Sequence, residues 1–222
     1  MTTVPRIADP VAFIRANTKI LAPPLVPELR LHLAQESLPI WMKTEEELGA
    51  SGLPPPYWAF AWAGGQAVSR HVLDNPGLVA GKRVLDLAAG CGLGGIAAMR
   101  AGAAAAICND IDDFAGAAIG LNAGLNGVTV EIALADLLSG PPADAAVVLV
   151  GDVFYEKPLA ERALRWLRTC RAAGADVITG DPKRSYFPRD AFEYMADYLV
   201  PVSRELEDAE FKHTSVWRLR RN

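Results

Sequence analysis

Two polar residues follow an apolar run in the middle of the chain. The run AAVVLV (145–150) is typical of a buried strand, and GDVFY (151–155) comes directly after it. An acid and a phenol are costly to bury without a partner, so Asp152 and Tyr155 are expected at an open edge where a ligand can meet them. A carboxylate there can stabilise positive charge, and a phenol can donate or accept a hydrogen bond. The alternative is that both residues cap the helix expected to begin near Pro158.

A glycine-rich stretch, DLAAGCGLGG (86–95), follows another apolar strand and opens a helix. Gly90 and Gly92 let the backbone turn tightly and approach a ligand closely, and the following helix offers its N-terminal N–H groups. We therefore expect Gly90 and Gly92 to bind a cofactor that carries a ribose or a phosphate. With Gly95 they also satisfy GxGxxG, the dinucleotide fingerprint, so an NAD-binding oxidoreductase is the alternative.

Three acids near the expected strand ends bear on that choice. Asp86 lies four residues before Gly90, where it would repel a pyrophosphate and hold a cationic cofactor. Asp110 ends the next strand and is placed for ribose hydroxyls, whereas Asp136 follows the third strand and is placed for an adenine amino group. NAD enzymes share an acid at the second strand, so Asp86 and Asp136 together favour S-adenosylmethionine. The alternative for Asp110 and Asp136 is the capping of turns.

These residues need elements that bring them to one edge, and the chain from residue 64 onward has an alternating pattern. Apolar strands alternate with amphipathic helices, which is typical of a mostly parallel sheet covered on both faces. The last two strands are joined by a loop too short for a crossover helix, so they predict an antiparallel edge. The predicted fold is α/β, with a doubly wound, Rossmann-like sheet of seven strands. The expected strands are 82–89, 104–110, 128–134, 145–152, 175–181, 198–206 and 213–219, and the expected helices are 66–74, 93–102, 113–126, 158–173 and 188–196.

Residues 1–60 are expected to form an N-terminal extension packed on a domain of residues 61–222. An Asp-Pro pair predicts a short helix through about Asn17, because aspartate is a common N-cap and proline a common first helical residue. A strand over 27–33 and a charged helical turn over 44–48 are expected after it. The extension should fold onto the domain because it carries several large apolar side chains, namely Phe13, Leu21, Leu31 and Trp41.

Composition narrows the class of protein. With 222 residues the chain can bury a large core without metal or disulfide support. Its 51% hydrophobic and 22% charged residues, without an apolar stretch near the roughly 20 residues of a membrane span, argue against disordered and membrane classes. The formal net charge of −4 makes broad nucleic-acid binding unexpected. The scattered cysteines and histidines predict no metal site, and the N-terminal segment, which shows neither a signal nor a transit pattern, predicts a cytoplasmic protein.

Several motifs together resemble a known family. VLDLAAGCG (84–92), NDID (109–112) and GDVFY resemble the seven-strand class I methyltransferases, in particular the lysine methyltransferases with Asp-x-x-Tyr after the fourth strand. Within that group, the segment that begins PPYWAFAWAGG, with GDP (180–182) and TSVW (214–217), closely resembles the electron transfer flavoprotein β-subunit lysine methyltransferases. The resemblance runs along residues 55–222. Mitochondrial members carry a presequence that is not evident here, so a bacterial member is expected.

The resemblance implies methyl transfer from S-adenosylmethionine to a lysine of a protein. In that fold the first and fourth strands are neighbours, which puts Asp152 and Tyr155 beside the glycine-rich loop. Asp152 would orient the lysine amine and stabilise the ammonium as it forms, and Tyr155 would fix the lone pair of the amine. Trp62 is expected in the cofactor wall, since the related enzymes place a tryptophan there.

The acceptor site also needs apolar walls, because lysine in water is protonated and a dry channel lowers its pKa. Phe154, Trp58 and Phe60 could supply them, with core packing as the alternative for Trp58 and Phe60. Asp181, after the fifth strand, either contacts the protein substrate or caps a turn. The basic pair at 183–184 either meets an acidic partner or is simply solvated.

The expected function is therefore that of a protein-lysine N-methyltransferase, with the electron transfer flavoprotein β subunit as the first-choice substrate. The same fold hosts enzymes that act on other proteins, such as a ribosomal stalk protein, on RNA or on small molecules, because fold does not determine the acceptor. An NAD-binding oxidoreductase is the remote alternative.

Overall fold

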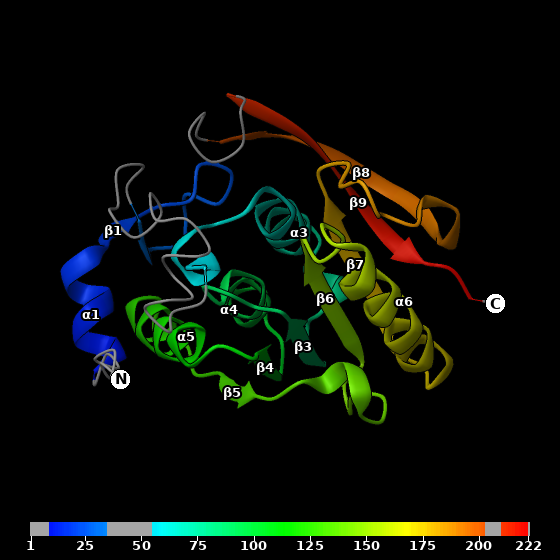
Figure 1. The fold of residues 1–222 in the computed structure, drawn as a ribbon, viewed down its shortest axis with the longest axis horizontal. Coiled ribbons are helices and arrows are strands. Elements are labelled where there is room, and N and C mark those ends of the chain that lie inside the picture. Colours follow the sequence, from blue (N-terminus) through cyan, green and yellow to red (C-terminus); the bar gives the residue numbers. More distant parts are fainter. Residues whose placement is uncertain (1–8, 35–54, 203–209, 222) are drawn as a thin grey trace, which may run out of the picture.

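The computed structural model describes residues 9–34, 55–202 and 210–221, and its main element is a seven-stranded sheet (Figure 1). The strand order is β5-β4-β3-β6-β7-β9-β8. The first five strands in this order pair in parallel, whereas β9 runs antiparallel to β7, and β8 antiparallel to β9. The predicted α/β fold with an antiparallel edge is confirmed.

The elements of the sheet and its covering helices agree closely with the alternation of the sequence. The strands are β3 (Arg83–Leu87), β4 (Ala105–Asp110), β5 (Glu131–Leu134), β6 (Val147–Gly151), β7 (Asp176–Asp181), β8 (Phe192–Pro201) and β9 (Phe211–Leu219). The helices are α3 (Ala63–Asp74), α4 (Leu93–Arg100), α5 (Asp113–Leu125) and α6 (Lys157–Ala172). None of the helices in these described ranges is long and apolar enough to cross a membrane.

The central strands are buried on both faces because successive side chains point to opposite sides. Val84 and Val147 belong to a core with α3 and α4, whereas their neighbours Leu85 and Val148 belong to a core with α6. Figure 1 shows α3 and α4 on one side of these strands and α6 on the other. Burial on both faces explains why these segments are nearly continuous apolar runs in the sequence.

The strands β3 and β6 lie side by side at the centre of the sheet, with Leu85 opposite Val148. The chain leaves β3 toward β4 and leaves β6 toward β7, in opposite directions along the sheet. Ligands of open α/β sheets bind at such a switch point, outside the carboxyl ends of the strands. This pairing brings the glycine-rich loop after β3 next to Asp152.

The described part of the N-terminal segment packs on the outer side of α5. Helix α1 (Pro10–Asn17) begins after Asp9, whose Oδ1 accepts a hydrogen bond from the Ala12 N–H at 3.0 Å, as the Asp-Pro pair predicted. Strands β1 (Lys19–Leu21) and β2 (Leu31–Leu33) form a short antiparallel pair. The expected turn over 44–48 and Trp41 lie outside the described residues, and the domain boundary at residue 60 stays a prediction.

Three expected elements differ from the structure. The strand expected over 198–206 begins earlier, in β8 at Phe192, and residues 203–206 lie outside the described residues. The strand over 27–33 is only three residues long, because the residues before it form turns that satisfy their own hydrogen bonds. The helix over 188–196 is wrong: a single 3-10 turn, Arg189–Ala191, leads into β8. A register shift between Tyr194 and Ala196 interrupts the alternation of this strand, and pairing with β9 overrides the helix preference of its Met and Ala residues.

Candidate active site

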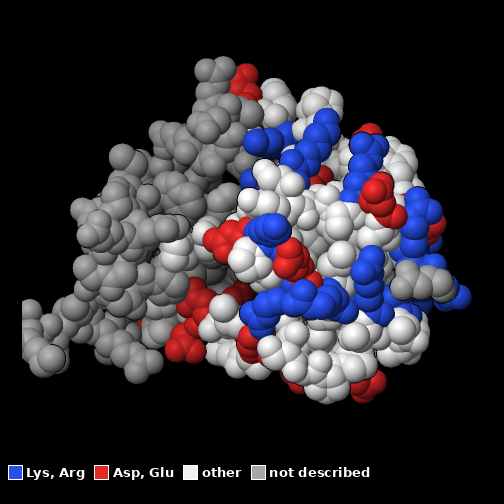
Figure 2. Space-filling view, turned by 45° about the vertical axis from the view of Figure 1, so that its right-hand side comes forward, with Lys and Arg blue, Asp and Glu red and all other residues white. Residues whose placement is uncertain are grey.

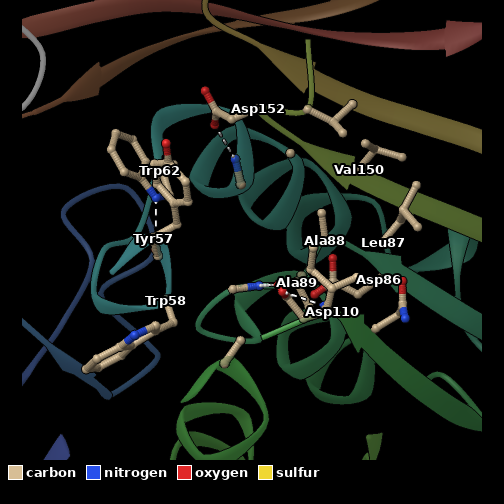
Figure 3. Close-up of a pocket in the computed structure, with 18 of the residues that line it drawn as sticks. Tyr57, Trp58, Trp62, Asp86, Leu87, Ala88, Ala89, Asp110, Val150 and Asp152 are labelled. Atoms are coloured by element: carbon tan, nitrogen blue, oxygen red, sulfur yellow. Dashed lines mark hydrogen bonds between the residues drawn. The ribbon is translucent and has the colours of Figure 1, made fainter. Parts of the chain in front are cut away.

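A cavity of about 470 Å³ lies at the carboxyl ends of the parallel strands. Its lining comes mainly from the loops that follow β3, β4, β5 and β6 and from residues 55–68, with Arg184 from the loop after β7. Figure 3 shows Asp86 and Asp110 across the cavity from Tyr57 and Trp62, with Asp152 at the N-terminus of α3. Cavities of this size are typical of sites for small molecules and cofactors.

The glycine-rich loop turns sharply at the edge of the cavity. Ala88, Gly90 and Gly92 all have positive φ, of 52°, 53° and 80°. Gly90 lines the cavity, and its N–H donates to Asp110 Oδ2 at 2.9 Å, which ties the loop to the end of β4. Gly92 is not in the lining; a Cβ there would meet Ile119 at 3.1 Å, so this glycine allows α4 and α5 to approach.

Asp86 is 5% exposed, lines the cavity and connects β3 to the start of α4. Its Oδ2 accepts a hydrogen bond from the Gly95 N–H at 2.8 Å, and a Cβ on Gly94 would lie 2.7 Å from its Oδ1. Burial raises the pKa of Asp86 to about 7, although the hydrogen bond from Gly95 lowers it. Gly94 thus makes room for the Asp86 carboxylate, and Gly95 donates to it while making room for the Cys108 sulfur. This is a different use of glycine from a pyrophosphate cradle.

The end of β4 carries two acids and an apolar side chain. The carboxylate of Asp110 accepts hydrogen bonds from the N–H groups of Gly90, Ile111 and Asp112. Asp112 caps α5 through the Phe114 N–H, and burial raises its pKa to about 6. Ile111 is 77% exposed and lines the cavity. Ile111 and Asp112 were not predicted as residues of the site, although their position in NDID beside Asp110 was a signal.

Asp136 lines the cavity at its outer side and also caps a turn. Its Oδ1 accepts from the Leu138 N–H at 3.1 Å, and its Oδ2 accepts from Arg162 at 2.6 Å. The hydrogen bond from Arg162 lowers the pKa of Asp136. The capping alternative is therefore present in the structure, while a role toward adenine stays a prediction.

Aromatic side chains form the wall opposite the glycine-rich loop. Tyr57, Trp58, Phe60 and Trp62 all line the cavity. The indole N–H of Trp62 donates to the Tyr57 carbonyl at 3.0 Å, which orients the ring. Trp58 is 3% exposed and stacks on Phe114, with ring centroids 5.9 Å apart. Trp58 and Phe60 thus both pack in the core and line the cavity, two roles that were alternatives from the sequence alone.

Asp152 lies at the end of β6 in a left-handed conformation, with φ 51°. Its Oδ2 accepts hydrogen bonds from the Gly64 and Gly65 N–H groups at the N-terminus of α3. Its Oδ1 accepts from Arg184 Nε at 3.0 Å and Nη2 at 2.8 Å. Arg184 is a site residue whose position beside the sequence-predicted Asp152 only the fold reveals.

Tyr155 lines the same end of the cavity and is 40% exposed. Its ring lies 5.8 Å from that of Tyr57, and burial raises its pKa to about 12. The phenol therefore keeps its proton at neutral pH and can donate a hydrogen bond.

Two expected substrate contacts, Phe154 and Asp181, are not in the cavity lining. Phe154 is fully buried and packs against Phe187 and Phe192 beneath α6, because the chain turns inward after Asp152. Asp181 is 1% exposed, and its Oδ1 accepts from the Arg184 N–H at 2.9 Å. This position corrects the expectation of substrate contact and matches the alternative of turn capping.

Within the ranges that the structure describes, no three His, Cys, Asp or Glu side chains gather in a group that could hold a metal ion. Cys91, Cys108 and Cys170 are buried, and each is a free thiol. Burial raises the pKa of Cys91 to about 12, so this thiol in the cavity wall stays protonated.

Solved structures of other proteins share this fold. A protein from Thermoplasma acidophilum matches 71% of this chain and 88% of its own, with a TM-score of 0.56 and 15% identity. Magnesium protoporphyrin IX methyltransferase from Synechocystis, solved with S-adenosylmethionine bound, matches 71% of this chain and 79% of its own, with a TM-score of 0.50 and 19% identity. At these identities the similarity concerns the fold alone.

Sequence comparison is more specific. The family described as ribosomal protein L11 methyltransferase matches residues 69–159. The electron transfer flavoprotein β-subunit lysine methyltransferase of Danio rerio is 37% identical over 213 residues, which cover 93% of this chain and 81% of the relative. The enzyme of the same name from Homo sapiens is 36% identical over 93% of this chain and 80% of its own. The chain therefore belongs to the family of electron transfer flavoprotein β-subunit lysine methyltransferases.

Proposed function

We propose that this protein transfers methyl groups from S-adenosylmethionine to lysine side chains of the electron transfer flavoprotein β subunit. The observation that carries the proposal is the identity of 37% with a relative named for that substrate, over nearly the whole chain. The cavity supports it, because one small volume contains acids for a cationic cofactor and an acid and a phenol for an amine. Relatives of this identity and coverage share a fold, and the acids and the phenol of this cavity suit the reaction for which the relative is named.

The charges of the cavity fit the proposed cofactor. Four carboxylates line the end near the glycine-rich loop, and of the two basic side chains in the lining, Arg162 is paired with one of them. A dinucleotide would bring two phosphates to this acidic end, whereas S-adenosylmethionine would bring a positive charge. When bound, the cofactor would supply a methyl group on a positively charged sulfur. The four carboxylates are those of Asp86, Asp110, Asp112 and Asp136.

We assign the cofactor contacts to residues of three loops. Asp110 ends β4 with its carboxylate at the cavity, in position for ribose hydroxyls, and Gly90 lets the backbone approach. Ile111 offers an exposed apolar surface for a flat base, and Asp136 stands beside the same region. Asp86 lies deeper, where a carboxylate would attract the cationic part of the cofactor.

The acceptor end is assigned to Asp152, Tyr155 and the aromatic wall. Asp152 places a carboxylate beside the nitrogen that becomes an ammonium, and the neutral phenol of Tyr155 can align the amine through a hydrogen bond. Trp62 and Tyr57 place aromatic rings beside them, and apolar surroundings favour the uncharged amine that attacks. Methyl transfer requires the protein mainly to position the two reactants and to stabilise the developing charge. These residues can do both in the proposed reaction.

The test is methyl transfer with the purified protein, the isolated flavoprotein and cofactor labelled in its methyl group. We expect label on lysines of the β subunit, located by mass spectrometry. Asp152→Asn should lower kcat/KM by about 10²–10³, in the range of a lost electrostatic contact in a transition state. Asp144→Asn, at an exposed position outside the cavity, is the matched control and should change little. Unchanged labelling by Asp152→Asn would contradict the assignment of this residue.

The same experiment can test a second class of acceptor, the ribosomal proteins. The match to the ribosomal protein L11 methyltransferase family over residues 69–159 makes a ribosomal protein the next candidate. Ribosomal proteins and ribosomal RNA, supplied separately, should remain unlabelled under conditions that label the β subunit. Label on a ribosomal protein with none on the β subunit would replace the proposed substrate.

Cofactor choice is tested by calorimetric titration. We expect binding of S-adenosylmethionine and S-adenosylhomocysteine, no binding of NAD, and a loss of affinity of about tenfold or more for Asp110→Asn. NAD binding without a response to S-adenosylhomocysteine would overturn the proposed cofactor. The cytoplasmic location expected from the sequence stays a prediction.

A further inference from the structure

Asp152 is already fully engaged as a hydrogen-bond acceptor. Each carboxylate has about four lone-pair sites, and four N–H groups point at those of Asp152. Two are backbone donors of Gly64 and Gly65, and two belong to the guanidinium of Arg184. An incoming lysine therefore meets a carboxylate that is neutralised and 9% exposed, and not a bare anion.

Arg184 is held in that place by its own loop. Its backbone N–H donates to Asp181 Oδ1 at 2.9 Å, and the preceding Lys183 has a φ of 67°, which bends the chain back toward β6. The guanidinium lies 6.0 Å from the centre of the Trp62 ring and forms part of the cavity lining. The side chain thus reaches the acceptor end of the cavity from the loop after β7, which is not one of the loops assigned to the cofactor.

This arrangement bears on a difficulty in the proposed reaction. An amine attacks a methyl group only when its lone pair is free, but lysine in water carries a proton, with a pKa of about 10.4. A bare carboxylate would stabilise the protonated form, whereas a nearby cation disfavours it. The pair formed by Asp152 and Arg184 keeps the acceptor end polar without the net negative charge that would keep an amine protonated.

We propose that Arg184 is a positioning residue. Its guanidinium saturates the Asp152 carboxylate and places a positive charge beside the incoming lysine, so that the site accepts lysine as a neutral amine. This inference rests on the proposed lysine methyltransferase function. The loop after β7 would then contribute to the chemistry, in addition to the Asp-x-x-Tyr segment.

Other charged or titratable groups face the same end of the cavity. Asp181 lies behind Arg184, and burial raises its pKa to about 7, so it titrates below the range in which lysine does. Among the described elements, α3 brings no titratable side chain in its first turn. The other groups near this end are Tyr57, Tyr155 and Glu156, and the acids Asp86 and Asp110 face it from the cofactor end of the same cavity.

The experiment is the pH dependence of kcat for the full chain with its protein acceptor, between pH 7.5 and 10.5. This profile reports groups of the enzyme–substrate complex, which includes the bound lysine. For Arg184→Gln we expect the apparent pKa to rise by one unit or more. The expected kcat therefore falls about tenfold at pH 7.5 and recovers toward the wild-type value near pH 10. KM for the acceptor should fall at pH 7.5, because the exposed carboxylate then holds the ammonium.

Two further variants test whether the charge of Arg184 causes the expected change in the pH profile. Arg184→Lys keeps the charge but loses the two-pronged contact, so it should restore most of the apparent pKa. Arg189→Gln removes a neighbouring arginine that lies over Trp217 and outside the cavity lining, and its profile should match that of the wild type. Thermal unfolding and titration with S-adenosylhomocysteine check that each variant is folded and binds the cofactor.

Three results would overturn the inference. A fall in kcat by the same factor at every pH would mean that Arg184 only supports the structure. A lower KM with unchanged kcat and unchanged profile would mean that Arg184 merely competes with lysine for Asp152. A profile of Arg184→Lys as displaced as that of Arg184→Gln would exclude the charge as the cause. Absence of lysine methylation by the wild type at any pH would instead contradict the proposed function itself.

Discussion

Single residues of this protein show how burial sets the charge state of acids at a site. The pKa of Asp181 is raised by burial from its ordinary value of 3.8 to about 7. Its Oδ1 accepts from the Arg184 N–H, while its Oδ2 is buried and has no hydrogen-bond partner in the described structure. A buried carboxylate with an oxygen left unsatisfied is costly, so the protonated form is favoured in the folded state.

The titration of Asp181 predicts a stability difference with a definite sign. Because the folded pKa lies above the unfolded one, the carboxyl destabilises the fold as pH rises from about 4 to about 7, and the penalty is complete above that range. Asp181→Asn keeps the Oδ1 acceptor and removes the charge. We expect it to raise Tm at pH 8 by about 2–4 °C, which corresponds to about 1 kcal/mol for a domain of this size.

The measurement is thermal unfolding at pH 5 and pH 8. At pH 5 the wild-type carboxyl is already protonated, so the variant and the wild type should unfold at nearly equal temperatures. Asp144→Asn at an exposed position is the control and should show no such pH dependence. An equal gain at both pH values, or a loss at pH 8, would show that the charge of Asp181 is not the cause.

At the scale of elements, the site depends on how closely α3 approaches the ends of β6 and β7. A Cβ on Gly64 would collide with the Gly180 carbonyl and lie 2.5 Å from Asp152 Oδ2. Gly151 and Gly180 face α3 in the same way, with the backbone of residues 64 and 65 against them. This contact without side chains is what lets the first N–H groups of α3 reach the Asp152 carboxylate.

Gly64→Ala should therefore open this contact. We expect a loss of about 2 kcal/mol or more in the free energy of unfolding, because the atoms that a Cβ would meet are mostly backbone and cannot move aside. Gly65→Ala is the matched neighbour: a Cβ there meets nothing within 4 Å, so the helix should be as stable or slightly more stable. Denaturant unfolding of the two variants makes the comparison, and equal effects would contradict the proposed close contact.

At the scale of the whole molecule, the distribution of charge is uneven although the net charge is only −4. Helix α6 carries five basic residues and one acid. Figure 2, which brings the right-hand side of Figure 1 forward, shows many Lys and Arg side chains on the face that contains this helix. The helix begins beside the cavity, with Leu159 and Arg162 in the lining, so the basic face adjoins the cavity.

This position predicts a charge contribution to binding of the protein acceptor. Arg165 and Arg168 are exposed, and neither forms an ion pair with the other residues that the structure describes. The double substitution Arg165→Glu and Arg168→Glu should raise KM for the protein acceptor about fivefold to tenfold at low salt. The difference should shrink at high salt, because exposed charges are screened.

The control places the same change of charge on the other side of the molecule. Arg15→Glu with Lys19→Glu, at exposed positions of α1 and β1 far from α6 in Figure 1, should leave KM for the acceptor nearly unchanged. Both double variants should keep the wild-type affinity for S-adenosylhomocysteine. A similar effect of the two double variants on KM would show that net charge, and not the face around α6, decides binding.

The sequence by itself determined the sheet, its order of elements and the loops at its ligand edge. Buried strands and amphipathic helices leave patterns of periodicity that depend only on local geometry, so β3, β6 and α6 were predictable to within a few residues. The acids that end strands, Asp110 and Asp152, could be predicted as site residues for the same reason. The helix predicted over 188–196 failed because β8 owes its conformation to pairing with β9, a contact between distant parts of the chain.

Only the tertiary structure decided which polar groups meet. Arg184 is 32 residues from Asp152, and their ion pair depends on the parallel pairing of β6 with β7 and on the bend at Lys183. The same packing buries Phe154, which follows Asp152 closely in sequence but points into the core. Periodicity states which face of an element is buried, whereas the partners of a side chain depend on distances between elements. The sequence therefore predicted the acid and the phenol of GDVFY, and the fold supplied the arginine beside them.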